Sequence, residues 1–553
     1  MSQQEISDTQ RALIFQGGGA LGAYEAGVFK EIYKKVKRND EERRNKKQIN
    51  LFNIVAGTSI GAINAAVIVG HFLKNNSWEG SPEKLTEFWK GLMSPTLADI
   101  SIGKNPFIGN WWDYLHLIDP NVASAEVARR FWSIFQFAFT LSGVPNMYLS
   151  IPQWNHKFLN PFTDLMPSWR YDYAPLRSYL SKFVDFPIKS SFEKGEPRLL
   201  LVSVDVQDYT DAVIFDSYKK QDAINDIDKD EWYSEYGHGQ NKHVVFYDGI
   251  ELDQVLASAL GKYALEHPTM EDMISKTQRQ FWDGGYHSNT PLRQLILAHR
   301  KYWYDYLKRK DTRELYRLPD LEVYIVNLHP SLVRNIPRDK DLIDDREHDI
   351  LFHDRTNFDE HIAYLVSDYV NLAVELIELG NSNGLADNVE EILNKAAKGF
   401  SRSRAESKKY KDIIEGRLDI TKVWRIDRLE DTEDTFGKNT DFSPTSIIKL
   451  IEDGENDAKI SLNKMEILFN IEDLIYDGVL SEQEGGELMK KTKEVGTWTG
   501  PSYGDKKRVI SSLHEFILLV NHANAEKLSL KERQSLINPA NTIINQLKII
   551  KNH

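Results

Sequence analysis

The sequence contains no cysteine among its 553 residues. Disulfide bonds, thiolate metal sites and a cysteine nucleophile are therefore excluded. Positive charge is also in deficit, because 69 Lys and Arg residues stand against 82 Asp and Glu residues and give a formal net charge of −13. This balance argues against a broad nucleic-acid-binding surface. It also repels an anionic membrane on average, although a local basic patch can still dock.

Long apolar runs are missing as well. The first residues, MSQQEISDTQ, lack the basic and apolar regions of a classical signal peptide. No run of about 18 apolar residues occurs, so we expect no transmembrane helix. The 41% of hydrophobic and 27% of charged residues are ordinary for a folded protein. These features predict a soluble, cytoplasmic protein whose membrane contact, if any, is peripheral.

Strand and helix patterns alternate near the N-terminus. Residues 11–16 form an apolar strand pattern, and residues 20–36 have apolar positions at helical spacing. A second pair follows, with LFNIVAGTS as a strand and IGAINAAVIVGHFL as a helix. This order predicts an α/β fold with a mostly parallel sheet. Further strands are expected at RLLLVSVDV, DAVIFDSY and KHVVFYDGI, a helix over 252–263, and a final strand at LEVYIVNLHP.

Helical patterns dominate from about residue 345 to the end. The last 90 residues contain two segments of the form helix, short turn with Leu-Ser, helix, which predicts two stacked helical hairpins. We therefore expect a catalytic domain over 1–465, with its core at about 10–330 and a helical extension at 345–465. A helical-hairpin region is expected over 466–553.

The glycine-rich segment 17–22, GGGALG, is compatible with two kinds of anion site. Its G-x-G-x-x-G spacing fits a dinucleotide pyrophosphate, and its first three glycines fit a loop that offers backbone N–H groups to an oxyanion. The nucleotide interpretation needs an acidic residue that ends the second strand about 20 residues later. The acidic residues 40–42 lie instead in a charged, non-strand stretch, which favours the oxyanion.

The segment GTSIG at 57–61 has the G-x-S-x-G pattern of a nucleophile elbow. A strand precedes Ser59 and an apolar helix follows it, as the sharp strand-to-helix turn requires. The N-terminus of that helix favours negative charge at the serine. A serine hydroxyl needs a base, and Asp283 in WDGGYHSNTP is a candidate, although Asp-Gly-Gly is also a common turn without catalytic function.

These three elements, in this order, resemble the patatin-like phospholipases over about residues 10–330. The resemblance implies a three-layer α/β/α sandwich and a Ser–Asp dyad that needs no cofactor or metal. It also implies a partly buried, relatively dry aspartate. One departure is Leu21, where many members have Arg or Lys. The residues singled out are Ser59 and Asp283 for catalysis, Gly17, Gly18 and Gly19 for the oxyanion hole, Gly22, Gly57, Gly61, Gly284 and Gly285 as motif glycines, and His287 and Asn289 as possible pocket residues.

Two alternatives stay open beside the dyad. An α/β-hydrolase with a catalytic histidine would draw on His267, His287, His299 or His329, none of which lies in a motif of its own. Only about 40 residues separate the glycine loop from the serine, which disfavours that fold. The other alternative is a patatin-like scaffold that binds lipid or a partner without turnover.

Aromatic residues are concentrated between 105 and 175. We expect a lid-like insertion there that contacts acyl chains, although aromatics at helical spacing also build ordinary cores. Arg129 and Arg130 would suit lipid phosphates. The sequence thus predicts a lipid acyl hydrolase acting on phospholipid or lysophospholipid esters, with transient membrane-surface contact and no nucleic-acid partner. A homo-oligomer is possible.

Overall fold

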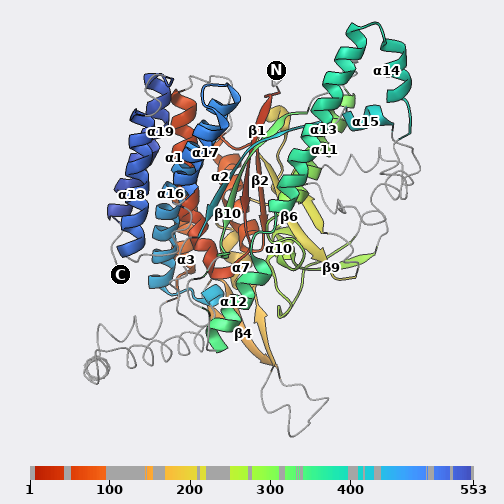
Figure 1. Ribbon diagram of the computed structural model, residues 1–553. Helices are drawn as coiled ribbons and strands as arrows, with labels where there is room; N and C mark the ends of the chain where they lie inside the picture. Colours follow the sequence, from red (N-terminus) through yellow and green to blue (C-terminus); the bar gives the residue numbers. More distant parts are fainter. Residues whose placement is uncertain are drawn as a thin grey trace.

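The computed structural model consists of a central sheet between two layers of helices, with further helices from the C-terminal region packed at one side (Figure 1). The structure describes residues 6–42, 51–94, 143–144, 146–153, 168–207, 212–218, 249–271, 277–309, 318–331, 333, 336, 340–396, 409–414, 417–428, 438–493, 495, 503–522 and 527–549.

The sheet has eight described strands in the order β11-β10-β1-β2-β6-β9-β8, with β7 also paired to β6. Strands β11, β10, β1, β2 and β6 run parallel, and β7 and β9 run antiparallel to β6. The bounds are β1 Thr9–Phe15, β2 Ile54–Thr58, β6 Arg198–Asp205, β7 Val213–Asp216, β8 Thr269–Glu271, β9 Gln278–Asp283, β10 Asp320–Asn327 and β11 Ile420–Asp427.

Alternate side chains of the central strands enter different helical layers, as the two-residue period of a strand requires. Leu13 and Phe15 pack in one apolar cluster with the layer of α1, α2, α3 and α16, whereas Ala12 and Ile14 pack with α11 on the other face. This arrangement confirms the predicted α/β/α sandwich. The helix bounds are α1 Gly22–Glu42, α2 Ile60–Asn75, α3 Ser81–Leu92, α11 Leu292–Arg309 and α16 Pro444–Tyr476.

Further elements surround the sandwich. Helices α13 and α14 project beyond the sheet (Figure 1), and Leu372, Leu376 and Leu379 of α13 are each more than half exposed. The remaining bounds are β3 Gly143–Val144, β4 Tyr148–Gln153, β5 Ser168–Asp172, α7 Ala174–Leu180, α10 Leu252–Ala259, α12 Lys340–Phe352, α13 Asn357–Ser382, α14 Ala386–Leu393 and α15 Tyr410–Ile414, with 3-10 helices η1 Gly19–Leu21, η2 Phe192–Lys194, η3 Gly284–Tyr286 and η5 Lys438–Thr440.

The C-terminal helices are α16, α17 (Glu482–Lys493), α18 (Tyr503–His522) and α19 (Leu530–Ile549). Helix α16 continues without a break through residue 465, where the sequence analysis ends the catalytic domain. Ala458 and Leu462 belong to the apolar cluster of the sandwich, whereas Ile467 belongs to the cluster of the C-terminal helices. The two cores therefore meet along one helix, and the division into domains stays a prediction.

The structure differs from the expected elements in two places. The region 345–465, expected to be helical, contains β11, which extends the sheet beside β10. The helix expected over 252–263 ends at Ala259, because Leu260 adopts an extended conformation. The strand expected at KHVVFYDGI and most of the lid-like insertion at 105–175, with Arg129 and Arg130, lie outside the described residues.

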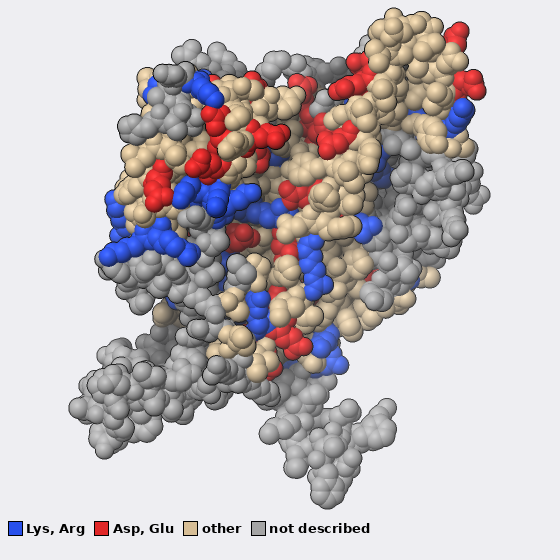
Figure 2. Space-filling model, viewed as in Figure 1, with Lys and Arg blue, Asp and Glu red and all other residues tan. Residues whose placement is uncertain are grey.

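Charges of both signs are mixed on the face shown in Figure 2. Over the C-terminal helices, Lys and Arg side chains gather in a band that lies directly below a group of Asp and Glu side chains (Figure 2). Within the described residues, no helix combines the length and the apolar character needed to cross a bilayer.

Candidate active site

Ser59 occupies the turn between β2 and α2. Its backbone has φ 57° and ψ −127°, a strained conformation for a residue with a side chain. The turn is so tight that a Cβ atom added to Gly57 would lie 2.3 Å from the oxygen of Gly61. A Cβ atom added to Gly61 would lie 2.5 Å from the oxygen of Phe15. Both motif positions therefore require glycine, and Ser59 is held, partly exposed, at the end of the strand.

Asp283 ends β9, and its side chain meets Ser59. The Ser59 Oγ donates to Asp283 Oδ2 at 2.5 Å, and the Gly285 amide donates to Asp283 Oδ1 at 2.7 Å. A Cβ atom on Gly284 would lie 2.1 Å from the oxygen of Val202, so the turn after Asp283 packs directly on β6. The structure thus brings together two side chains that are 224 residues apart in the chain.

Sheet register explains why these two side chains meet. Thr58 of β2 pairs with Val202 of β6, and Asp283 of β9 pairs with Ser203 on the other side of β6. Ser59 and Asp283 therefore stand at the same level of the sheet, at the carboxyl end of β2. Strand β9 is antiparallel to β6 but also ends at this edge, where α/β proteins commonly place their sites.

Burial raises the pKa of Asp283 from 3.8 to about 6, against the opposing effect of the hydrogen bonds from Ser59 and Gly285. Desolvation disfavours the charged carboxylate, which makes it a stronger base. A carboxylate with a pKa this close to neutrality can accept a serine proton more readily than an ordinary aspartate.

The glycine loop lies against Ser59. A Cβ atom on Gly17 would lie 2.8 Å from the Cβ of Ser59, so this glycine allows the loop to touch the elbow. The Gly17 amide donates to the oxygen of Asn289 at 3.3 Å. For the amides of Gly18 and Gly19, no acceptor is recorded among the described residues. These two amides precede α1, where backbone N–H groups and the helix dipole favour an anion.

The geometry thus combines a serine, a carboxylate and a glycine loop. The model of the patatin-like phospholipase family matches residues 13–296, just over half of the chain. This chain belongs to the patatin-like phospholipase family. A crystal structure of VipD from Legionella pneumophila matches with 10% identity and a TM-score of 0.21, and the match covers 98% of this chain and 92% of that chain. A search of curated proteins finds no match.

Leu21 stands where many patatin-like proteins have a cation. Its side chain is fully buried in the apolar cluster that also contains Phe15 and Ile60. Gly22, the next residue, is equally constrained, because a Cβ atom there would lie 2.7 Å from Ile60. In this patatin-like chain the end of the loop is therefore anchored by apolar packing.

Two of the candidate histidines contact backbone oxygens. His299 Nε2 contacts the oxygen of Pro319 at 2.7 Å, and His329 Nε2 contacts the oxygen of Gly17 at 3.0 Å. His287 is exposed on the turn after Asp283, and His267 is half-buried against Trp282. The side chain recorded as partner of Ser59 Oγ is Asp283, which favours the dyad over a histidine triad.

Asp40, an acidic residue at the spacing that a nucleotide site would need, is paired with Arg11. Asp40 lies on α1 and accepts from Arg11 through both carboxylate oxygens, at 2.6 and 2.7 Å. This bidentate ion pair uses both oxygens of the Asp40 carboxylate. Asp40 therefore serves the packing of α1 against β1.

The sequence analysis did not single out Gln16 and Glu25, which form buried hydrogen bonds next to the glycine loop. Gln16 is fully buried, and its Oε1 accepts from the Leu328 amide at 2.7 Å. Glu25, also fully buried, accepts from the Gln16 amide at 2.7 Å, and burial raises its pKa well above the usual value. Gln16 directly precedes the glycines, but nothing in the local pattern distinguishes it from an ordinary loop residue.

Proposed function

We propose that this chain is a serine-dependent lipid acyl hydrolase of the phospholipase A or lysophospholipase type. The observation that carries the proposal is the 2.5 Å hydrogen bond from Ser59 Oγ to Asp283 Oδ2 beside the glycine loop. Membership of the patatin-like family supports an ester of a lipid as the substrate.

In the proposed reaction, Ser59 Oγ attacks the ester carbonyl carbon while its proton passes to Asp283 Oδ2. The amides of Gly18 and Gly19 stabilise the oxyanion, because the Gly17 amide already donates to Asn289. The carbon–oxygen bond to the alcohol then breaks, and Asp283 returns the proton to the leaving oxygen. Water hydrolyses the acyl-enzyme with Asp283 again as the base, and this step regenerates Ser59.

Tyr286 lies near Asp283, with Tyr263 close to Tyr286, and both side chains suit an ester with an apolar chain. Tyr263 and Tyr286 are 55% and 50% exposed. Burial and the nearby Asp283 charge both raise the pKa of Tyr286, so its ring lies within electrostatic reach of the dyad. Aromatic rings with a hydroxyl offer apolar contact and a polar tip together. These two exposed rings support our proposal that this protein, which we propose to be cytoplasmic, makes transient contact with a membrane surface.

A lipid-panel assay tests the proposal. Native protein should release fatty acid from phospholipid or lysophospholipid, whereas Ser59→Ala and Asp283→Asn should release none above background. His267→Ala and His287→Ala should retain turnover, which separates the dyad from a histidine triad. A fluorophosphonate should label Ser59 in the native protein. Absence of both labelling and turnover would favour a non-catalytic lipid-binding scaffold.

A further inference from the structure

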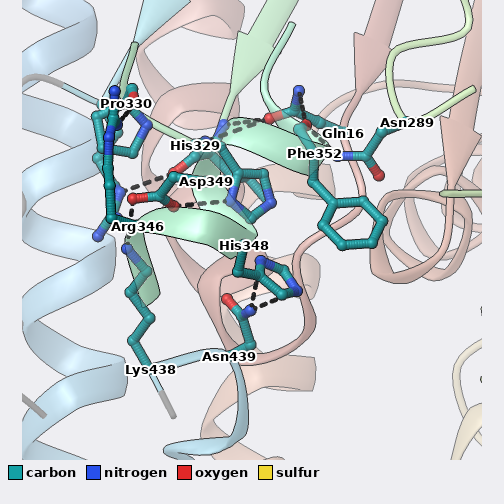
Figure 3. Close-up of polar contacts among 12 residues, drawn as sticks. Gln16, Asn289, His329, Pro330, Arg346, His348, Asp349, Phe352, Lys438 and Asn439 are labelled. Carbon is teal, nitrogen blue, oxygen red and sulfur yellow. Dashed lines mark hydrogen bonds and ion pairs between the residues drawn. The ribbon is translucent and has the colours of Figure 1, made fainter. Parts of the chain in front are cut away.

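A polar cluster that includes half-buried Asn289 and buried His329 and Asp349 lies behind the glycine loop (Figure 3). The Asn289 Nδ2 donates to the oxygen of Gly17 at 3.0 Å and to the oxygen of Phe352 at 2.7 Å. The His329 Nε2 lies 3.0 Å from the same Gly17 oxygen, and its Nδ1 lies 3.1 Å from Asp349 Oδ1. The cluster borders the dyad, because a Cβ atom on Gly285 would lie 3.0 Å from Asn289 Oδ1 and 3.1 Å from Asp283 Oδ1.

We propose that Asn289 is a positioning residue that holds the Gly17–Gly18 peptide in the orientation that presents the Gly18 amide to the reacting ester. This inference rests on the proposed hydrolase function and assigns a role within the same site.

The planarity of the peptide bond makes one hydrogen bond control another. The Gly17 carbonyl and the Gly18 N–H belong to one rigid trans unit and point in opposite directions. With the carbonyl oxygen held by Asn289, the Gly18 N–H is directed away from the cluster. If this peptide flipped, it would present an oxygen to the developing oxyanion and remove a donor. Glycine on both sides makes such a flip sterically easy, so the loop needs an external restraint.

Asn289 restrains Gly17 from two sides. Its backbone oxygen accepts from the Gly17 amide at 3.3 Å, while its side chain donates to the Gly17 oxygen. Both recorded partners of Nδ2 are carbonyl oxygens, which assigns the side-chain amide orientation without ambiguity. Asn289 also lies six residues after Asp283, so it ties the oxyanion loop to the turn that carries the base.

Helix α12 and the loop after β10 support this restraint. The oxygen of Phe352, at the end of α12, receives the second Asn289 donor, and Lys438 Nζ donates to Asp349 Oδ2 at 2.7 Å. Both ring nitrogens of His329 face acceptors, the Gly17 oxygen and Asp349 Oδ1, so His329 donates to both only as the imidazolium. His329, Asp349 and Lys438 are buried, and the half-buried Asn289 side chain is fixed by two hydrogen bonds, as preorganised donors require.

Asn289→Asp tests the role, because it keeps the size of the side chain and replaces its donors with acceptors. The charged side chain would face the oxygens of Gly17 and Phe352 and repel both. We expect kcat for a lysophospholipid to fall by about 10²-fold or more, which is the loss that follows removal of an oxyanion donor, with KM little changed. The matched control is Asn470→Asp, since Asn470 Nδ2 donates to the oxygen of Ser535 at 3.0 Å in the C-terminal helices.

A fall in kcat for Asn289→Asp that Asn470→Asp does not share, in variants of similar unfolding midpoint, supports the role. An unchanged kcat, or an equal loss in both variants, overturns it. A crystal structure of Asn289→Asp gives a readout independent of turnover, because the Gly17 oxygen should turn away from residue 289; an unmoved peptide overturns the proposal. A native protein without esterase activity would contradict the proposed function alone, since the peptide orientation would still test Asn289.

Discussion

Replacing Asp283 by Asn should abolish turnover and at the same time stabilise the fold. Burial moves the carboxyl pKa from 3.8 to about 6, which corresponds to about 3 kcal/mol of unfavourable free energy for the ionised form in the folded protein. An amide of the same shape avoids this cost, because it can accept from Gly285 and donate to Ser59. We therefore expect Asp283→Asn to raise the free energy of unfolding by up to about 3 kcal/mol at pH 7.5.

The sign of the pH dependence follows from proton binding. Between pH 3.8 and about 6, the folded protein keeps the Asp283 proton that the unfolded chain has released, so the contribution of this group to stability falls as pH rises. The penalty is absent below this window and complete above it. The gain from Asp283→Asn should therefore be about half as large at pH 5 as at pH 7.5.

Urea unfolding at the two pH values measures this difference. Asp368→Asn, at an exposed carboxyl on α13, is the control and should change stability by less than about 0.5 kcal/mol. In the native protein, kcat/KM should rise with pH and level off above about pH 6, because the free enzyme needs ionised Asp283. If Asp283→Asn were no more stable than the native protein at pH 7.5, or if its gain were equal at both pH values, the reasoning about a desolvated carboxylate would be refuted.

Three further predictions concern the nucleophile, the elbow and the C-terminal core. Ser59→Ala should remove both ester turnover and fluorophosphonate labelling while circular dichroism stays native. Gly61→Ala should lower the free energy of unfolding by about 1–3 kcal/mol and lower kcat, because its Cβ atom would lie 2.5 Å from the oxygen of Phe15. The control Gly486→Ala, with no atom within 4 Å of its Cβ, should leave the free energy of unfolding unchanged or raise it. Equal losses in the two variants would contradict the packing argument. Phe516→Ala, at a fully buried position of the C-terminal cluster, should lower the free energy of unfolding by about 3–5 kcal/mol without changing kcat under native conditions; a loss of kcat would show coupling between the two cores.

Local patterns were sufficient to predict the elements that carry chemistry. The apolar strand, G-x-S-x-G and small-residue helix around Ser59 have a defined local geometry, and the structure places β2 and α2 where these patterns indicate. The same holds for β1, β6 and β10, whose buried apolar runs are typical of central parallel strands. Strand β11 was missed because ITKVWRID alternates polar and apolar residues within a region of helical patterns.

Sequence alone determined which groups the site contains: a serine on a strained turn, a carboxylate before two glycines, and a loop of bare backbone amides. Each is encoded by neighbouring residues, since backbone sterics act over a few positions. Tertiary structure decided what those groups can do. The register of β2 and β9 on β6 brought the Ser59 hydroxyl within 2.5 Å of the Asp283 carboxylate. Burial raised the pKa of that carboxyl. The backbone oxygen of Asn289 accepts from the Gly17 amide, and its side chain donates to the Gly17 oxygen. These properties depend on desolvation and on contacts between residues more than 200 positions apart, which no local pattern records.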